Sequence, residues 1–150
     1  MKTLVMGYGN TLRGDDGIGL WMAQQIEQDK LPGVLAAEAQ QLPIEAVDDC
    51  EAYDRVVLLD CAAGGPAFAL RPLHPDAASG IGTSHYVTAS LMVSLARLLN
   101  KKVPEFYLGS VRGESFDLGA PITAEVYERA RALLKELRGL LSQEEEVHHA

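Results

Sequence analysis

The stretch GYGNTLRGDDGIG, residues 7–19, follows directly on the apolar run Leu4-Val5-Met6 and contains five glycines and two adjacent carboxylates. An apolar run, a glycine-rich loop and then a helical pattern are typical of the point where a first strand passes into a first helix. Glycines allow backbone angles and close approaches that a Cβ would forbid. We therefore interpret this loop as shaped for a ligand, and Asp15 and Asp16 limit which ligand it can hold.

A nucleotide is the first alternative for such a loop. The dinucleotide fingerprint Gly-x-Gly-x-x-Gly is broken here, because Leu12 stands at its third position, and no Gly-Lys-Ser/Thr of a P-loop follows. Two acids at a helix start would also repel a pyrophosphate. We expect Asp15 to cap the helix that begins near Gly17. Asp16 is then left to face the ligand.

Strand and helix patterns alternate along the whole chain. Strands are expected at residues 4–6, 34–39, 56–59, 68–73 and 106–111, and helices at residues 17–30, 43–53, 85–100 and 123–141. This alternation predicts an α/β fold: a three-layer α/β/α sandwich around a mostly parallel, twisted sheet of about five strands, of the phosphorylase/hydrolase-like kind. The segment 72–84, rich in Pro, Gly and Ser, is expected to be a long loop.

Length and composition describe a globular protein of one domain. The 150 residues are 47% hydrophobic and 23% charged, and the net charge is -8. The negative charge argues against nucleic acid or an anionic membrane as partner. We expect one α/β domain at 1–141, a charged and disordered tail at 142–150, and a monomer. The N-terminus lacks a signal-peptide pattern, which favours the cytoplasm.

Three side chains could meet in one crevice. Asp60 ends the apolar strand 56–59, and in the usual 2-1-3 strand order it would lie beside Asp16, because ligands bind at the carboxyl ends of parallel strands. His85 begins a helix, where the helix dipole favours a neutral imidazole that can bind a metal. Two carboxylates and one imidazole suit nickel, zinc, manganese or iron. Each residue alone has a more ordinary explanation, and their joint placement carries the hypothesis.

A side-chain nucleophile is the competing chemistry. Cys61 follows Asp60 in an extended segment, so its side chain should point to the opposite face of the sheet and be a buried thiol. Cys50 is expected in the core, and the two serines before His85 lie in no Gly-x-Ser-x-Gly elbow. We find no triad pattern.

The pattern Gly7-x-Gly-Asn10-x-Leu12-x-x-Asp15-Asp16-Gly17-x-Gly19 resembles the opening signature of the hydrogenase maturation proteases. These endopeptidases process the large subunits of nickel-iron hydrogenases. The resemblance extends to Asp60 at a strand end, to His85 opening a helix, and to the glycine-containing approach Leu118-Gly119-Ala-Pro121 before the last helix. Together these features cover the domain to about residue 140.

The resemblance implies a hydrolase without a conventional nucleophile, an aspartyl-type or metal-dependent endopeptidase. Its members remove a C-terminal extension from the hydrogenase large-subunit precursor after nickel insertion. Asp16, Asp60 and His85 match the family's metal-contacting positions and are the expected catalytic and metal-binding residues. The first of them is Glu or Asp in the family. The nickel is carried by the substrate and serves for recognition, so the isolated enzyme is expected to hold no permanent metal.

Two other classes stay open at this point. A nickel-sensing or metallochaperone module would use the same ligands without cutting a peptide, and would bind nickel tightly as an isolated chain. A nucleotide-binding α/β domain would bind NAD or ATP. The protease hypothesis predicts neither property.

Overall fold

The elements of the fold follow the alternation expected from the sequence. A computed structural model describes residues 1–41, 49–73, 84–99 and 103–149, and for 84–88 and 143–149 it describes the helical backbone only. In chain order the elements are β1 (Thr3–Tyr8), the 3-10 helix η1 (Gly14–Gly17), α1 (Ile18–Asp29), β2 (Val34–Ala39), β3 (Arg55–Ala62), β4 (Phe68–Leu73), α3 (Ser84–Leu99), β5 (Glu105–Arg112) and α4 (Ala124–His149).

The described strands form one sheet with the order β2-β1-β3-β5-β4. The pairs β1–β2, β1–β3 and β3–β5 are parallel, and β4 is antiparallel to β5 at one edge. A mostly parallel sheet of about five strands is therefore confirmed. Its first three strands have the predicted 2-1-3 order, which places the ends of β1 and β3 side by side.

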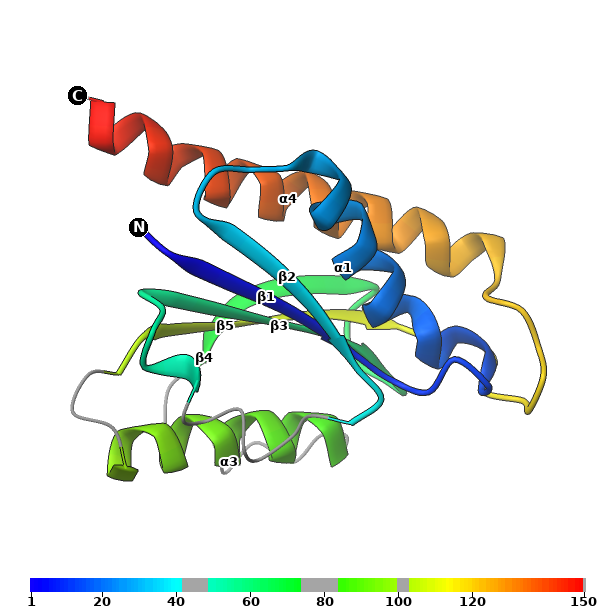
Figure 1. The fold of residues 1–150 in the computed structure, drawn as a ribbon. Coiled ribbons are helices and arrows are strands. Elements are labelled where there is room, and N and C mark those ends of the chain that lie inside the picture. Colours follow the sequence, from blue (N-terminus) through cyan, green and yellow to red (C-terminus); the bar gives the residue numbers. More distant parts are fainter. Residues whose placement is uncertain (42–48, 74–83, 100–102, 150) are drawn as a thin grey trace.

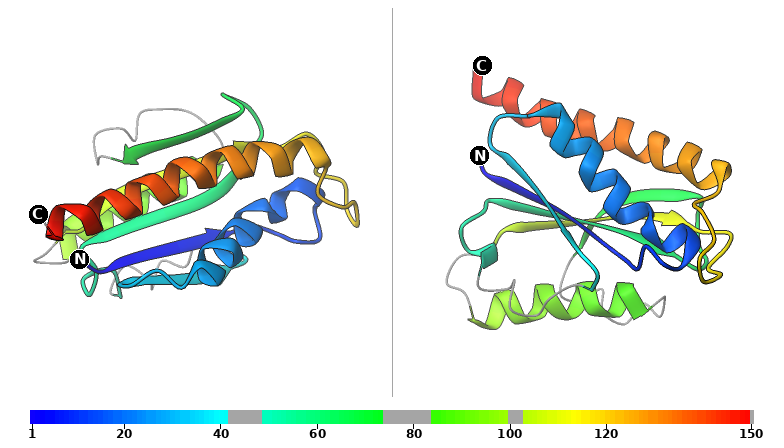
Figure 2. Two further views of the ribbon diagram at one scale, coloured as in Figure 1. Left: turned by 90° about the horizontal axis from the view of Figure 1, so that it is seen from above. Right: turned by 45° about the vertical axis from the view of Figure 1, so that its right-hand side comes forward.

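Helices cover both faces of the sheet. Figures 1 and 2 show α1 and α4 together over one face and α3 over the other. The central strand β3 contributes side chains to both cores, because alternate side chains of a strand point to opposite faces of the sheet. Val56 and Leu58 pack in the core under α3, while Val57 and Leu59 pack in the core under α1 and α4. Burial on both faces explains why this strand reads as an unbroken apolar run.

Some segments expected from the sequence lie outside the described residues or end at other positions in the structure. Residues 42–48 and 74–83 lie outside the described part, and they include most of the helix predicted at 43–53 and of the loop predicted at 72–84. Asp49 and Cys50 are helical, and the chain turns at residues 51–52. Helix α4 continues beyond Leu141 to His149, over the segment for which a disordered tail is expected. Among the described residues, no helix is both long and apolar enough to cross a membrane.

Candidate active site at the carboxyl ends of β1 and β3

Two parallel strands bring the candidate carboxylates to the same edge of the sheet. Gly7 of β1 lies opposite Leu59 of β3 in the register of the sheet. The glycine loop that carries Asp16 therefore leaves β1 close to Asp60, as the 2-1-3 order predicts. Strand β3 continues through Asp60 to Ala62, so Asp60 lies within the strand, opposite Ser110 of β5, and not just after its end.

Asp60 is a buried carboxylate with a tyrosine as hydrogen-bond donor. Its side chain is 1% exposed, and the hydroxyl of the equally buried Tyr8 donates to its Oδ2 at 3.3 Å. Burial raises the pKa of Tyr8 above its usual range, and the negative charges of Asp60 and Asp16 raise it further. Tyr8 therefore stays protonated and donates to Asp60. Sequence reasoning missed Tyr8, although its place at the end of β1, beside Asp60 of β3, was a signal.

Asp16 is half-buried and closes the glycine loop. Its Oδ2 accepts a hydrogen bond of 2.6 Å from the backbone N–H of Asn10. The Asn10 side chain in turn accepts from the N–H of Leu12 at 2.9 Å, the pattern of an Asx turn. Gly9 has φ 152°, and a Cβ there would collide with the backbone carbonyl of Asp16. The loop thus needs glycine at position 9 to bring Asp16 against Asn10.

The expectation that Asp15 caps its own helix is wrong. Neither η1 nor α1 has a side-chain cap, and Asp15 is completely buried. Its carboxylate instead accepts hydrogen bonds from the backbone N–H groups of Glu114, Ser115 and Thr123, at 2.7, 2.8 and 2.7 Å. Burial alone would raise the pKa of Asp15, but these N–H donors outweigh it and hold the pKa below its usual value. Because the donors lie about a hundred positions away in the chain, no local pattern could have revealed them.

The backbone position of His85 follows from its place in α3. It is the second residue of α3, which starts at the end of the molecule that carries the carboxyl ends of β1 and β3 (Figure 1). The side chain of His85 lies outside the described residues, so its approach to Asp16 and Asp60 remains a prediction. Among the side chains that are described, no three His, Cys, Asp or Glu residues form a group able to hold a metal.

The two cysteines are buried thiols, as expected. Cys61 is 2% exposed and packs in the core under α1 and α4, on the sheet face opposite the core that contains Tyr8. Burial raises the pKa of Cys61, and the charges of Asp16 and Asp60 raise it further. Cys50 is also buried, and its pKa is raised to about 11. Since the thiolate is the reactive form, neither thiol is suited to act as a nucleophile near neutral pH.

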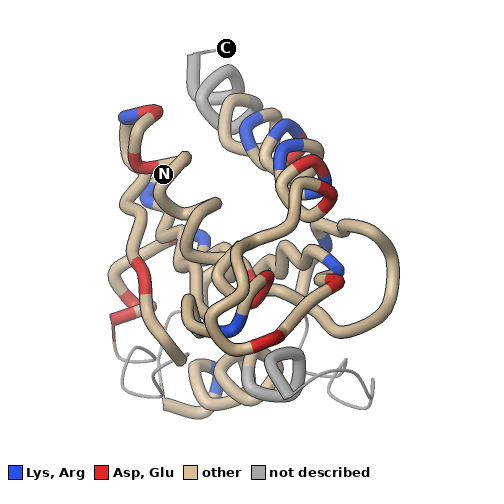
Figure 3. Tube along the Cα trace, turned by 90° about the vertical axis from the view of Figure 1, so that its right-hand side faces the viewer, with Lys and Arg blue, Asp and Glu red and all other residues tan. Residues whose placement is uncertain are grey.

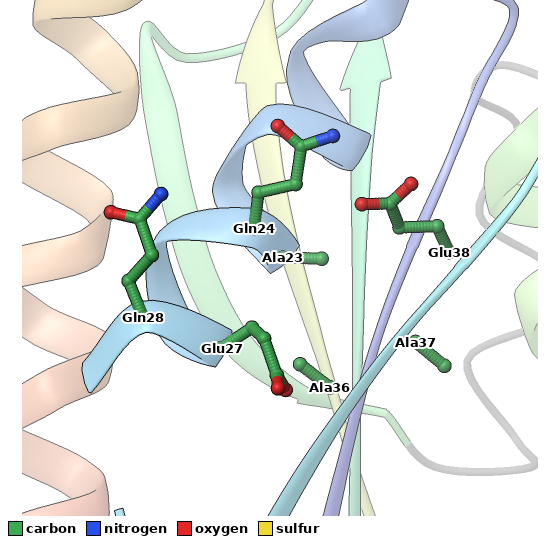
Figure 4. A pocket seen from close by; sticks show the side chains of 7 residues that line it. All are labelled: Ala23, Gln24, Glu27, Gln28, Ala36, Ala37 and Glu38. Carbon is green, nitrogen blue, oxygen red and sulfur yellow. The ribbon is translucent and has the colours of Figure 1, made fainter. Parts of the chain in front are cut away.

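Two hollows of the described surface lie away from these carboxylates. Figure 4 shows one of them, between α1 and the edge strand β2, where Gln24 and Glu38 face each other above small alanines. The other lies between α3 and the amino end of β5 and is mostly apolar. Neither is lined by Asp16 or Asp60.

Figure 3 looks onto the side of the molecule where β1 and β3 end. Acidic segments lie near the centre of this view, and acidic and basic residues are interleaved along α4.

Comparison with known proteins gives a match at the level of structure. No family model matches the chain, and no curated protein matches it by sequence. Among solved structures, a hydrogenase maturation protease HybD from Thermococcus kodakarensis superposes with a TM-score of 0.76 at 20% identity, covering 94% of this chain and 99% of that one. The maturating endopeptidase HybD from E. coli gives 0.76 at 19% identity, covering 96% and 94%.

This chain has the fold of the hydrogenase maturation proteases. A third structure of that group, HycI from Thermococcus kodakarensis, gives a TM-score of 0.68 at 24% identity, with 94% of this chain and 92% of that one covered. The resemblance drawn from the glycine loop is thus confirmed for the fold over nearly the full chain. At these identities the likeness shows the fold alone.

Proposed function

We propose that this protein is a hydrogenase maturation endopeptidase, which removes the C-terminal extension of a nickel-iron hydrogenase large-subunit precursor after nickel insertion. The observation that carries the proposal is that the loop after β1, which carries Asp16, and the end of β3, which carries Asp60, lie at the same edge of the sheet, on a fold shared with proteases of this kind. The proteins named in the comparisons are maturation proteases or endopeptidases. The proposed substrate is a protein, and the cleaved bond is a peptide bond.

In this proposal Asp16, Asp60 and His85 bind the nickel that the precursor carries. The donor set is two carboxylates and one imidazole, which suits nickel. The burial of Asp60 supports the assignment, because an ionised carboxylate is costly to bury unless a cation or hydrogen-bond donors compensate its charge. Tyr8 donates one hydrogen bond to this carboxylate, and a substrate-borne cation would add an opposite charge beside it.

The scissile peptide bond would lie in the crevice, where a polarised water attacks its carbonyl. A metal ion can lower the pKa of water from 15.7 to about 7, and an aspartate can serve as general base. Either route works without a serine or cysteine nucleophile. This agrees with the buried, protonated state of Cys50 and Cys61.

The test is to incubate the protein with a large-subunit precursor, either nickel-loaded or nickel-free, and to measure the precursor mass. We expect loss of a C-terminal peptide from the loaded form only. Cleavage of both forms would contradict recognition through nickel, while leaving the protease activity in place. An unchanged mass with a folded, matched precursor would contradict the protease itself.

The same material separates the protease from a nickel-sensing or metallochaperone module. Titration calorimetry with nickel on the isolated chain should show only weak binding, because the precursor brings the metal. Tight binding without cleavage would support the module instead. We further propose that the chain acts as a cytoplasmic monomer, and sedimentation at the concentration of the cleavage assay checks the monomer.

A further inference from the structure

Two loops that are far apart in the sequence are tied together beside the candidate site. The carboxylate of Asp15 lies at the centre of the contact and is completely buried. Its Oδ2 accepts from the N–H groups of Glu114 and Ser115, and its Oδ1 accepts from the N–H of Thr123 at 2.7 Å and from the Thr123 hydroxyl at 3.2 Å. Both carboxylate oxygens are thus used to hold residues 114–123, which make up most of the connection between β5 and α4.

Backbone contacts join the same two loops. The N–H of Asp15 donates to the carbonyl of Ser115 at 2.8 Å, and the N–H of Gly119 donates to the carbonyl of Leu12 at 2.7 Å. Gly14 has φ 54°, and a Cβ there would lie only 2.6 Å from the Ser115 carbonyl oxygen. The loops are therefore in direct backbone contact, and the Asp15 side chain adds hydrogen bonds between them.

This contact reaches both candidate carboxylates. Asp16 is the next residue after Asp15 in η1, so its backbone moves with the Asp15 anchor. At the other end, the N–H of Gly113 donates to the carbonyl of Ala62 at 2.8 Å, two residues after Asp60 in β3. The connection after β5 therefore contacts β3 just after Asp60 and, further along, contacts Asp15, the residue next to Asp16.

Resting on the function proposed above, we propose that Asp15 is a positioning residue: its buried carboxylate clamps residues 114–123 onto η1 and thereby holds Asp16 in place relative to Asp60. Asp15 does not touch the substrate. Its role is to keep the binding-competent arrangement populated before the precursor arrives.

The clamp predicts a particular kinetic signature. When only a fraction of the molecules is pre-organised, apparent affinity falls in proportion to that fraction. A bound precursor that holds Asp16 through its nickel restores the arrangement. Loss of the clamp should therefore raise KM and leave kcat nearly unchanged. A variant that is only partly folded would instead lower the apparent kcat and leave KM unchanged, because only the concentration of active enzyme falls.

The experiment compares Asp15→Ala and Asp15→Asn with the wild type in steady-state processing of the nickel-loaded precursor. We expect KM to rise at least tenfold in Asp15→Ala, with kcat within twofold of the wild type. Asp15→Asn should be intermediate, because one oxygen remains to accept the N–H groups of Glu114 and Ser115. The matched control is Leu137→Ala, a buried α4 substitution that lowers stability away from the loops and should leave KM unchanged.

Hydrogen exchange on the proteins without precursor gives a readout independent of activity. In Asp15→Ala the amides of Glu114, Ser115 and Thr123 should lose protection, and in Asp15→Asn that of Thr123 should lose it, while those of Leu133 and Leu134 in α4 keep it. If Asp15→Ala fails to fold, Asp15→Asn and Thr123→Val carry the same comparison. Unchanged protection at these amides, or an unchanged KM in a folded Asp15 variant, overturns the proposal. A wild-type protein that leaves the precursor intact contradicts the proposed function, and the clamp is then still tested by exchange.

Discussion

At the scale of single residues, the site depends on a carboxylate placed where burial is costly. Asp60 lies in the core beside Tyr8, whose hydroxyl donates to it at 3.3 Å. Leaving a buried polar group without one of its partners costs about 1–3 kcal/mol. We therefore expect the buried Asp60 carboxylate to depend on the hydrogen bond from the Tyr8 hydroxyl.

Tyr8→Phe removes this donor without changing the shape of the ring. We expect the free energy of unfolding to fall by about 1–3 kcal/mol, measured by urea denaturation. Tyr53→Phe, at a partly buried tyrosine packed against the same core, is the control and should lose less. Equal stability of Tyr8→Phe and the wild type would show that the hydroxyl does not support Asp60.

For the two cysteines we expect that substitution leaves catalysis unchanged. Cys50→Ala and Cys61→Ala should each process the precursor at the wild-type kcat, because both thiols are buried and protonated. Each loses some packing, so the melting temperature is expected to fall. A loss of kcat in a folded Cys61→Ala protein would make the thiol part of the chemistry and would contradict a metal-dependent or aspartate-dependent mechanism.

At the scale of elements, the glycine loop depends on backbone conformations that other residues rarely adopt. Gly14→Ala places a Cβ at a positive φ and against the Ser115 carbonyl. We expect a loss of stability of about 1–3 kcal/mol, measured by thermal or urea unfolding. Gly139→Ala is the control, because it lies exposed in α4 with open space around its Cβ, and it should stabilise the helix by up to about 1 kcal/mol. A neutral Gly14→Ala would contradict the close contact of the two loops.

The sequence predicted the elements better than the contacts between them. The apolar run of β3 and the helical spacing of α1 and α4 depend on local periodicity, which can be read directly. The antiparallel direction of β4 and the role of Asp15 depend on partners elsewhere in the chain, at residues 105–112 and 114–123. The placement of Asp16 and Asp60 at the same edge of the sheet was predictable only because parallel sheets share a rule of strand order. No such rule predicts the direction in which the His85 side chain points.

At the scale of the whole molecule, ionisation of buried groups limits the pH range of the fold. Folding raises the pKa of Cys50 from 9.0 to about 11 and raises that of Tyr8 above 10.0. A group whose pKa is raised by folding contributes its full stability below its unfolded pKa and loses it as the pH rises. The free energy of unfolding should therefore fall between about pH 9 and pH 11.

Urea denaturation at a series of pH values checks this dependence. Cys50→Ala should show a shallower alkaline decline than the wild type, because one of the buried groups with a raised pKa is removed. On the acid side the sign is reversed: the lowered pKa of Asp15 gives stability that is lost as the pH falls through that pKa. A wild-type stability that does not change from pH 9 to pH 11 would contradict the burial of both groups in their neutral forms.

In the proposed function, Asp16 and Asp60, together with His85, act on a nickel-bearing precursor. The most direct measurement is the intact mass of a nickel-loaded large-subunit precursor after incubation with wild-type protein, with Asp16→Asn, Asp60→Asn and His85→Gln, and with the exposed control Asp49→Asn. We expect the wild type and Asp49→Asn to release a C-terminal peptide, and the three site variants to fold normally yet leave the mass unchanged. Processing by a folded Asp60→Asn protein at the wild-type rate would contradict the claim.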